Sequence, residues 1–139
     1  MPVIYTAETT VEGGRSGHAR SSDGKLDVAL SSPGSSGSGT NPEQLFAAGY
    51  SACFLSAVEW HGQRSGIDVA NPRVEAAVEL VEEDGDYFLR ARLDVSASAV
   101  SQEQLAELVG KAHATCPYSK ATRGNVEVTF AVNGQPFEV

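Results

Sequence analysis

Apolar and polar residues alternate along several segments of the chain, and this pattern predicts β-strands. The alternation is clearest at 74–80 and 89–95, and the Asp84-Gly85 dipeptide between them is typical of a hairpin turn. It recurs near the C-terminus at 126–132. Because successive side chains of a strand point to opposite faces, each strand has one apolar face. We expect an antiparallel sheet with helices packed on that face, which is an α+β fold.

The first part of the chain combines weaker strand signals with two segments rich in glycine. Residues 2–11 favour extended structure, 26–30 alternates like a strand, and Gly13-Gly14 marks a turn between them. The segment 31–39, SSPGSSGSG, has the composition of a flexible surface loop. We therefore expect short strands followed by a loop.

The segment 42–65 predicts a long helix with very little charge. No charged residue occurs between Glu43 and Glu59. Pro42 suits the first helical position, and Asn41 or the threonine before it can cap the helix. Because the middle of the helix is apolar nearly all round, we expect it to be buried nearly all round. Its many small residues allow close approach by neighbours, including those of another subunit.

A second helix is predicted at about 101–115, where Ser101 and Gln104 form a capping-box pattern. Pro117 ends this helix, because the residue before a proline disfavours the α conformation. A short third helix can begin at Pro117. The apolar stripe of the second helix consists of Leu105, Leu108, Val109 and Ala112, and Cys116 continues it.

The composition limits the classes of function. The 139 residues fit a single domain covering 1–139, and the formal net charge of −8 argues against nucleic acid and anionic membranes as partners. The N-terminus lacks a secretory signal, and the longest uncharged stretch is shorter than the roughly 20 apolar residues of a membrane span. We expect a soluble protein of the cytoplasm.

Two cysteines are too few for a disulfide scaffold. Cys53 lies in the uncharged helix, where it is either an inert core residue or a thiol that the helix presents. Cys116 lies at a helix break, where unpaired backbone N–H groups can stabilise a thiolate. Both apolar helix faces should meet the same core, so the two thiols can pair reversibly, although their spacing alone does not show it.

Arg15 and Glu43 are the charged candidates for the site. Arg15 lies among glycines in GGRSG, either as a solvated turn residue or as a cation that lowers the pKa of a thiol. Glu43, in the first helical turn, either stabilises the helix dipole or holds Arg15 in place. Ten residues of helix rise about 15 Å, so Glu43 does not reach Cys53 directly.

A metal site has little support in the pattern. His113 and Cys116 are neighbours on a helix, and His61 lies about two turns beyond Cys53. The chain has no CxxC or HExxH motif, so zinc ligands would have to come from distant places. We expect no metal, and the chain also lacks phosphate-loop, GxGxxG and GxSxG motifs.

Four segments resemble the organic hydroperoxide resistance (Ohr) branch of the OsmC/Ohr family. They are GGR at 13–15, SSDGKLDV at 21–28, GTNPEQLFAAGYSACF at 39–54 and CPYSKATRGNVEV at 116–128. The match runs in order over nearly the whole chain, and NPEQLFAAGYSACF is highly specific. The resemblance implies an α+β fold, with antiparallel sheets packed on long central helices in an intertwined homodimer.

The resemblance also implies roles for four residues. Cys53 matches the peroxidatic cysteine and Cys116 the resolving cysteine of the family. Arg15 matches the arginine that contacts the peroxidatic sulfur, and Glu43 the glutamate that pairs with it.

The activity that this implies is a thiol-dependent peroxidase, which reduces organic hydroperoxides through a Cys53 sulfenic acid and a Cys53–Cys116 disulfide. A dithiol reductant, implied to be a lipoylated protein, reopens the disulfide, and no metal, haem or flavin cofactor is required. Two other functions remain open: an OsmC-like peroxidase of different substrate preference, and a dimeric binder of hydrophobic ligands. Four aromatic residues either line a pocket for organic substrates or only pack the core: Phe46, Tyr50, Phe54 and Tyr118.

Overall fold

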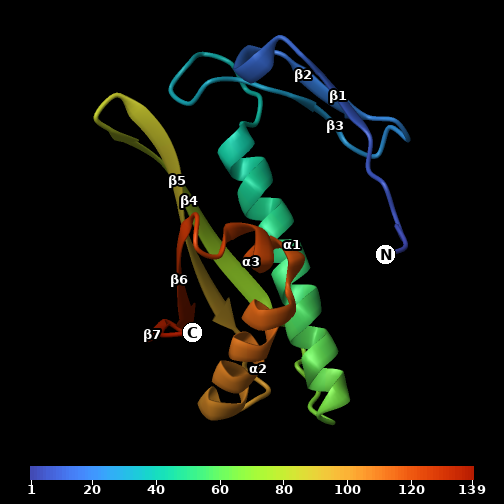
Figure 1. The fold of residues 1–139 in the computed structure, drawn as a ribbon, viewed down its shortest axis with the longest axis vertical. Coiled ribbons are helices and arrows are strands. Elements are labelled where there is room, and N and C mark those ends of the chain that lie inside the picture. The colour runs from blue at the N-terminus through green and yellow to red at the C-terminus, as the bar shows by residue number, and fades with distance from the viewer. The chain divides into compact units, whose positions relative to one another are not determined.

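The computed structural model describes all residues from 1 to 139 and divides into two compact units, Met1–Leu45 and Phe46–Val139. Helix α1 (Pro42–Arg64) begins in the first unit and continues through the second. Figure 1 shows the elements in chain order, with the first unit in blue and the second in green to red. The predicted α+β class is confirmed, because both units contain sheet and the second adds helices.

The first unit contains a three-stranded antiparallel sheet in the order β1-β2-β3. A single 3-10 turn, η1 (Gly14–Ser16), joins the first two strands, and the positive φ of Gly13 and Gly14 confirms the predicted turn. The strands are β1 (Thr9–Glu12), β2 (His18–Ser21) and β3 (Asp27–Ala29).

The strand predicted at 2–11 is mostly wrong, since only 9–12 is paired. β2 is four residues long and its register with β1 covers Thr9 to Glu12, so the residues before Thr9 have no strand partner. Local preference for extended structure does not form a strand without one. The segment 31–39 is a loop, as predicted, closed by a bridge between Leu30 and Thr40.

The second unit contains a four-stranded sheet in the order β4-β5-β6-β7. β4 and β5 form the predicted hairpin, with Asp84 and Gly85 at positive φ in its turn. β7 was not predicted; it follows a tight turn at Asn133 and Gly134. The strands are β4 (Arg73–Glu83), β5 (Asp86–Ser96), β6 (Glu127–Val132) and β7 (Gln135–Phe137).

One strand pair departs from the antiparallel pattern that the sequence suggested. β5 and β6 are parallel, with Arg90 opposite Glu127 and Val95 opposite Val132. The two helices between these strands form a crossover, which returns the chain to the end of the sheet where β5 began. The sheet is therefore mixed, and the crossover carries Cys116.

The ends of the helices follow the capping signals in the sequence. The Ser101 side chain accepts a hydrogen bond from the Gln104 backbone N–H at 3.1 Å, and the Ser101 N–H donates to the Gln104 side chain, which confirms the capping box. The Asn41 side chain accepts from the Gln44 N–H at 2.9 Å, one turn into α1. The two shorter helices are α2 (Gln102–Thr115) and α3 (Pro117–Thr122).

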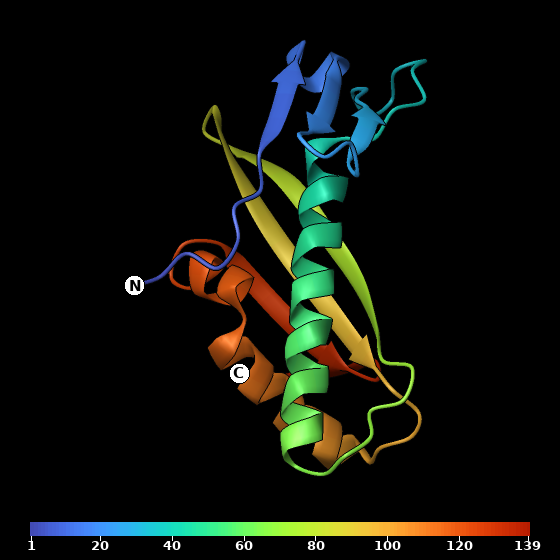
Figure 2. The same ribbon diagram turned by 90° about the vertical axis from the view of Figure 1, so that its right-hand side faces the viewer.

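The core of the second unit lies between its helices and one face of its sheet. Figures 1 and 2 show α1 and α2 on the same side of the strands. Leu93 and Val95 of β5 and Phe130 of β6 meet the apolar stripe of α2 and one stripe of α1 in this cluster. The fully or nearly fully buried α1 residues are spaced by four: Tyr50, Phe54, Val58 and Gly62.

We expected α1 to be buried nearly all round, by neighbours that include another subunit, and within this single chain one face of α1 is buried. Ala48, Ala52 and Ser56 are exposed, and they form a stripe of their own at a spacing of four. A sheet covers only one face of a helix that packs on it, so the opposite face needs another partner to be buried.

No helix in the structure has both the length and the hydropathy that crossing a bilayer requires.

Candidate functional site

The structure brings the two cysteines together. Cys53 lies in the middle of α1 and Cys116 lies between α2 and α3, and their sulfur atoms are 3.7 Å apart. Both are free thiols. A disulfide has a sulfur–sulfur separation of about 2.05 Å, so the two sulfurs must approach by about 1.7 Å to form one.

The two thiols differ in accessibility. Cys116 is 0% exposed, whereas Cys53 is only partly buried. Cys53 is therefore the sulfur that a solute can reach first, and Cys116 is placed behind it.

The immediate surroundings of Cys53 do not by themselves activate it. Burial raises the pKa of the Cys53 thiol, and the neighbouring Cys116 acts in the same direction, whereas a hydrogen bond from the Tyr118 backbone lowers it. A raised thiol pKa means less thiolate at neutral pH, and the thiolate is the nucleophile. Reactivity at Cys53 therefore requires a further stabilising group.

Cys116 is fixed by the backbone on both sides. Its N–H donates to the Ala112 carbonyl at 2.8 Å and its carbonyl accepts from the Lys120 N–H at 3.0 Å. Cys116 is therefore both the C-cap of α2 and the N-cap of α3. The sequence suggested that unpaired backbone N–H groups at this helix break would stabilise a thiolate at Cys116. The backbone hydrogen bond from Tyr118, in the first turn of α3, is instead directed at Cys53.

Arg15 and Glu43 form a bidentate ion pair within the first unit. The Arg15 guanidinium donates from Nη1 to one Glu43 oxygen at 3.0 Å and from Nη2 to the other at 2.7 Å. The hydrogen bond from Arg15 holds the pKa of the Glu43 carboxyl below its usual value. The loop at Gly13–Gly14 presents the arginine, and the first turn of α1 presents the carboxylate.

The four aromatic residues named from the sequence form one group in the second unit. The Phe46 ring contacts the rings of Tyr50 and Tyr118 edge-on, with centroids 6.1 and 6.5 Å away. Tyr50 and Phe54 are fully buried, so core packing describes their position; Tyr118 is 39% exposed. That these residues line a substrate pocket stays a prediction.

Gly49 is one of the small residues of α1 that we expected to allow close approach by neighbours, and Tyr118 makes that approach. A Cβ atom at Gly49 would lie 2.7 Å from the Tyr118 hydroxyl oxygen, closer than van der Waals contact allows. The glycine therefore leaves room for the Tyr118 ring against α1. A lone glycine inside a predicted helix was the available signal for a close approach.

A polar cluster around the buried Ser119 hydroxyl was missed. The Tyr50 hydroxyl lies 2.8 Å from the Ser119 hydroxyl and 3.3 Å from that of Thr122, and His113 Nδ1 lies 2.9 Å from Ser119 Oγ. Burial lowers the pKa of His113, and the charge of Arg123 lowers it further. Serine and threonine are common on helix surfaces, so the burial of Ser119 and Thr122 was not predictable from residue type.

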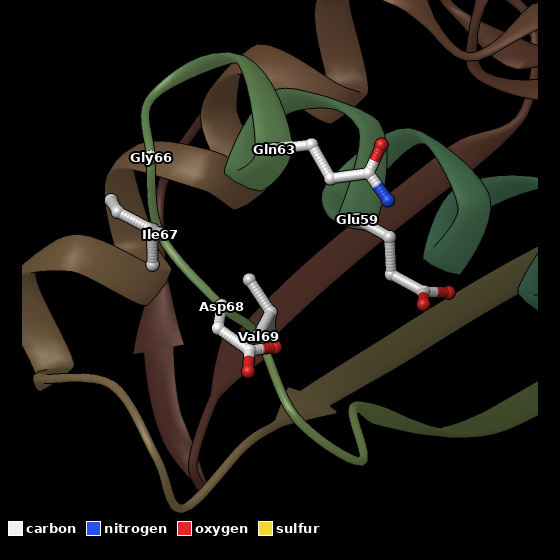
Figure 3. Close-up of a pocket in the computed structure, with 6 residues that line it drawn as sticks. All are labelled: Glu59, Gln63, Gly66, Ile67, Asp68 and Val69. Carbon is white, nitrogen blue, oxygen red and sulfur yellow. The ribbon is translucent and has the colours of Figure 1, made fainter.

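A pocket of about 350 Å³ lies elsewhere in the second unit and contains none of the predicted site residues. Figure 3 shows Glu59 and Gln63 projecting from the end of α1 beside the segment that follows it, from Gly66 to Val69. The structure contains no group of three or more His, Cys, Asp or Glu side chains arranged to hold a metal ion.

Comparison with known proteins places the chain in a family. Residues 34–131 match the model of the family described as OsmC-like protein. The organic hydroperoxide resistance protein of Xanthomonas axonopodis pv. citri is 42% identical over 135 residues, covering 94% of this chain and 95% of the relative. The organic hydroperoxide resistance protein OhrB of Bacillus subtilis is 45% identical over 130 residues, covering 90% and 95%.

Solved structures agree with the sequence comparison. The crystal structure of Bacillus subtilis OhrB superposes with a TM-score of 0.88 at 42% identity, covering 94% of this chain and 99% of the other. An organic hydroperoxide resistance protein from Elizabethkingia anophelis, with thiocyanate bound, gives a TM-score of 0.87 at 40% identity, covering 95% and 98%. The chain belongs to the OsmC/Ohr family, as its motifs predicted.

Proposed function

We propose that this protein is a thiol-dependent peroxidase that reduces organic hydroperoxides to alcohols. The observation that carries the proposal is the pair of free thiols with sulfurs 3.7 Å apart, one accessible and one buried. The relatives named organic hydroperoxide resistance proteins support hydroperoxides as the substrate class. A binder of hydrophobic ligands needs no such pair of thiols.

The reaction begins at Cys53. Its thiolate attacks one oxygen of the peroxide bond, the O–O bond breaks, and the other oxygen takes a proton and leaves as the alcohol. Cys53 is oxidised to a sulfenic acid. The partial exposure of Cys53 supports its role as the attacking sulfur.

Arg15 supplies the activation that the surroundings of Cys53 lack. An always-charged guanidinium stabilises the thiolate and donates hydrogen bonds as negative charge develops on the leaving oxygen. Glu43 positions Arg15, which the bidentate ion pair supports. Phe46, Tyr50, Phe54 and Tyr118 favour hydroperoxides with organic groups over hydrogen peroxide.

Cys116 completes the cycle. Its thiol attacks the Cys53 sulfenic acid, an S–S bond forms, and the sulfenic oxygen leaves as water. A dithiol then reduces the bridge by thiol–disulfide exchange and is itself oxidised to a disulfide; we propose a lipoyl group on a partner protein as this dithiol. Metal, haem and flavin have no part in the proposed cycle.

We further propose that the chain works as one domain over residues 1–139, in a homodimer. The exposed stripe of Ala48, Ala52 and Ser56 supports a partner on that face of α1, because small residues permit close helix approach. The cycle starts from two reduced thiols, and the cytoplasm is the compartment that keeps thiols reduced.

The test is to treat the reduced protein with cumene hydroperoxide, without reductant, and to measure intact and peptide masses. We expect a Cys53–Cys116 disulfide in the wild type, and sulfenic or higher acids of Cys53 in Cys116→Ala. If both thiols stay reduced while the peroxide persists, the chain is not a peroxidase.

Comparing the rates for cumene hydroperoxide and hydrogen peroxide tests the substrate class. We expect the organic peroxide to react faster. Equal rates would favour an OsmC-like peroxidase of broader preference and would remove the argument for an organic-substrate pocket.

A further inference from the structure

The polar cluster around the buried Ser119 hydroxyl joins the three helices that carry the cysteines. Ser119 belongs to α3, Tyr50 to α1 and His113 to α2, and both partners lie within 2.9 Å of the Ser119 hydroxyl oxygen. Ser119 is 0% exposed, as is Tyr50. The cluster is therefore a three-way tie whose Ser119 and Tyr50 members are fully buried and whose His113 member is half-buried.

Each member of the tie lies one helical turn from a cysteine. Tyr50 precedes Cys53 by three residues, and His113 precedes Cys116 by three. Ser119 follows Cys116 by three residues. The hydrogen bonds of the tie therefore connect the three backbone segments that carry or flank the two cysteines.

The hydroxyl of Ser119 is suited to this arrangement. It has one proton to donate and two lone pairs that accept, so it can serve Tyr50 and His113 at once. Thr122 adds a second contact to Tyr50 at 3.3 Å and donates to the Ser119 carbonyl at 3.2 Å. Removing the Ser119 hydroxyl leaves the buried Tyr50 hydroxyl on α1 and the half-buried His113 ring on α2 without that partner, which favours a shift of the helices.

We propose that Ser119 is a positioning residue for disulfide formation, which holds Cys116 against Cys53 so that Cys116 captures the sulfenic acid before a second peroxide does. This inference rests on the peroxidase function proposed above. The sulfurs are 3.7 Å apart with the tie in place. A displacement of about 1 Å can slow a reaction about 100-fold when the reacting groups depend on their alignment.

In this role Ser119 influences which of two competing reactions the Cys53 sulfenic acid undergoes. The Cys53 sulfenic acid reacts either with Cys116, which gives the disulfide and water, or with more peroxide, which gives the sulfinic acid and alcohol. Loosening the tie slows only the first of these reactions.

The experiment measures the two oxidation steps separately in Ser119→Ala. Rapid mixing with one equivalent of cumene hydroperoxide, followed by quenching with dimedone, gives the rates of sulfenic acid and disulfide formation from intact masses. We expect the ratio of the disulfide rate to the sulfenic acid rate to fall at least about tenfold relative to the wild type. In excess peroxide, the fraction of Cys53 sulfinic acid should rise.

A second pair of variants keeps the proposal testable if Ser119→Ala does not fold. His113→Ala removes a partner of Ser119, whereas His113→Asn keeps a polar atom near the position of Nδ1. We expect His113→Ala to lower the ratio and His113→Asn to restore most of it.

Ser101→Ala is the matched control for loss of stability. It removes the cap of α2, where the Ser101 side chain accepts from the Gln104 N–H, without touching the tie. We expect a lower melting temperature and an unchanged ratio.

The outcomes separate this inference from the function on which it rests. A wild type that forms neither sulfenic acid nor disulfide overturns the peroxidase proposal itself. A wild type that completes both steps, with a ratio that Ser119→Ala and His113→Ala leave unchanged or that Ser101→Ala lowers equally, overturns the role of Ser119 alone.

Discussion

The ion pair of the first unit and the thiol pair of the second are held by opposite means. Arg15 and Glu43 attract one another strongly through two charge-assisted hydrogen bonds, and the Arg15 side chain is 45% exposed. Cys53 and Cys116 attract one another weakly, because a thiol is a poor hydrogen-bond donor, and Cys116 is fully buried. Direct attraction keeps the charges together, whereas the packing of three helices keeps the sulfurs together.

This difference predicts what each pair responds to. The ion pair should be sensitive to pH and to changes of charge. The thiol pair should be sensitive to helix packing, and its chemistry should depend on which sulfur is accessible.

The largest expected effect comes from removing the accessible sulfur. Cys53→Ser should abolish measurable consumption of cumene hydroperoxide, because a serine hydroxyl is not ionised at neutral pH and does not attack the peroxide bond. Cys116→Ser should still reduce at least one equivalent of peroxide per chain, because Cys53 is oxidised to the sulfenic acid or beyond. Peroxide remaining after a single turnover distinguishes the two variants; one full equivalent consumed by Cys53→Ser would assign the attack to another group.

The next largest effect is expected from Arg15→Ala. The rate of Cys53 oxidation should fall about 100-fold, the typical effect of losing one electrostatic donor, while the melting temperature falls only by the small contribution of the ion pair. Stopped-flow measurement of the first oxidation step gives the rate.

Arg73→Ala provides the control for Arg15→Ala, because Arg73 also pairs with a glutamate, Glu75, on an exposed surface. Its oxidation rate should equal that of the wild type. An equal fall in both variants would attribute the effect to net charge, and an unchanged rate in Arg15→Ala would remove Arg15 from the mechanism.

The dependence of folding stability on pH below neutrality should show the contribution of the Arg15–Glu43 ion pair. The pKa of Glu43 is lowered in the folded protein by Arg15, so its contribution to stability is complete above the unfolded carboxyl pKa and is lost as the pH falls through the folded value. Glu43→Gln should therefore be less stable than the wild type near neutral pH and should lose less stability on acidification below about pH 4.5.

Urea unfolding of the two proteins between neutral pH and pH 3 measures this difference. Glu75→Gln is the matched variant in the exposed pair and should leave the acid profile close to that of the wild type. Parallel profiles for Glu43→Gln and the wild type would mean that the ion pair contributes nothing to folding.

The smallest effect concerns the close approach at Gly49. Replacing a glycine inside a helix by alanine stabilises it by about 0.5–1 kcal/mol when space is available. At Gly110 a new Cβ atom meets only Phe137, at 3.8 Å, whereas at Gly49 it meets the Tyr118 hydroxyl at 2.7 Å. Gly49→Ala should therefore stabilise the protein less than Gly110→Ala does.

Urea unfolding of these two variants gives the cost of moving Tyr118 as the difference between them. Equal stabilisation would show that the Tyr118 ring moves aside freely, and packing around Cys53 would then be looser than the contacts suggest.

Local patterns predicted the elements whose signals lie within a few residues. Ser101 with Gln104 and the Asp84-Gly85 turn appear as expected, because caps and tight turns are formed by neighbours in sequence. The parallel pairing of β5 with β6 was not predictable, since alternation gives the face of a strand and not its direction.

The candidate site divides in the same way. The motifs around Cys53 and Cys116 identified both cysteines, and the apolar stripe that runs into Cys116 suggested that they meet. The contact of Ser119 with His113 was not predicted, because a polar residue of a helix looks the same in the sequence whether it faces water or the core, and His113 was considered only in relation to a metal site. The stripe at Ala52 is exposed in the single chain, because apolar composition shows that a helix face can be buried and does not show which neighbour covers it.

The sequence by itself determined the family, the helices and their caps, and which thiols and charges are available for chemistry. These follow from residue type and from interactions over a few positions. The tertiary structure decided that the two sulfurs lie 3.7 Å apart, that only one of them is accessible, and that a buried hydroxyl ties their helices together. Those facts depend on how α1, α2 and α3 pack on one sheet, and residues 63 positions apart meet only when the core has formed.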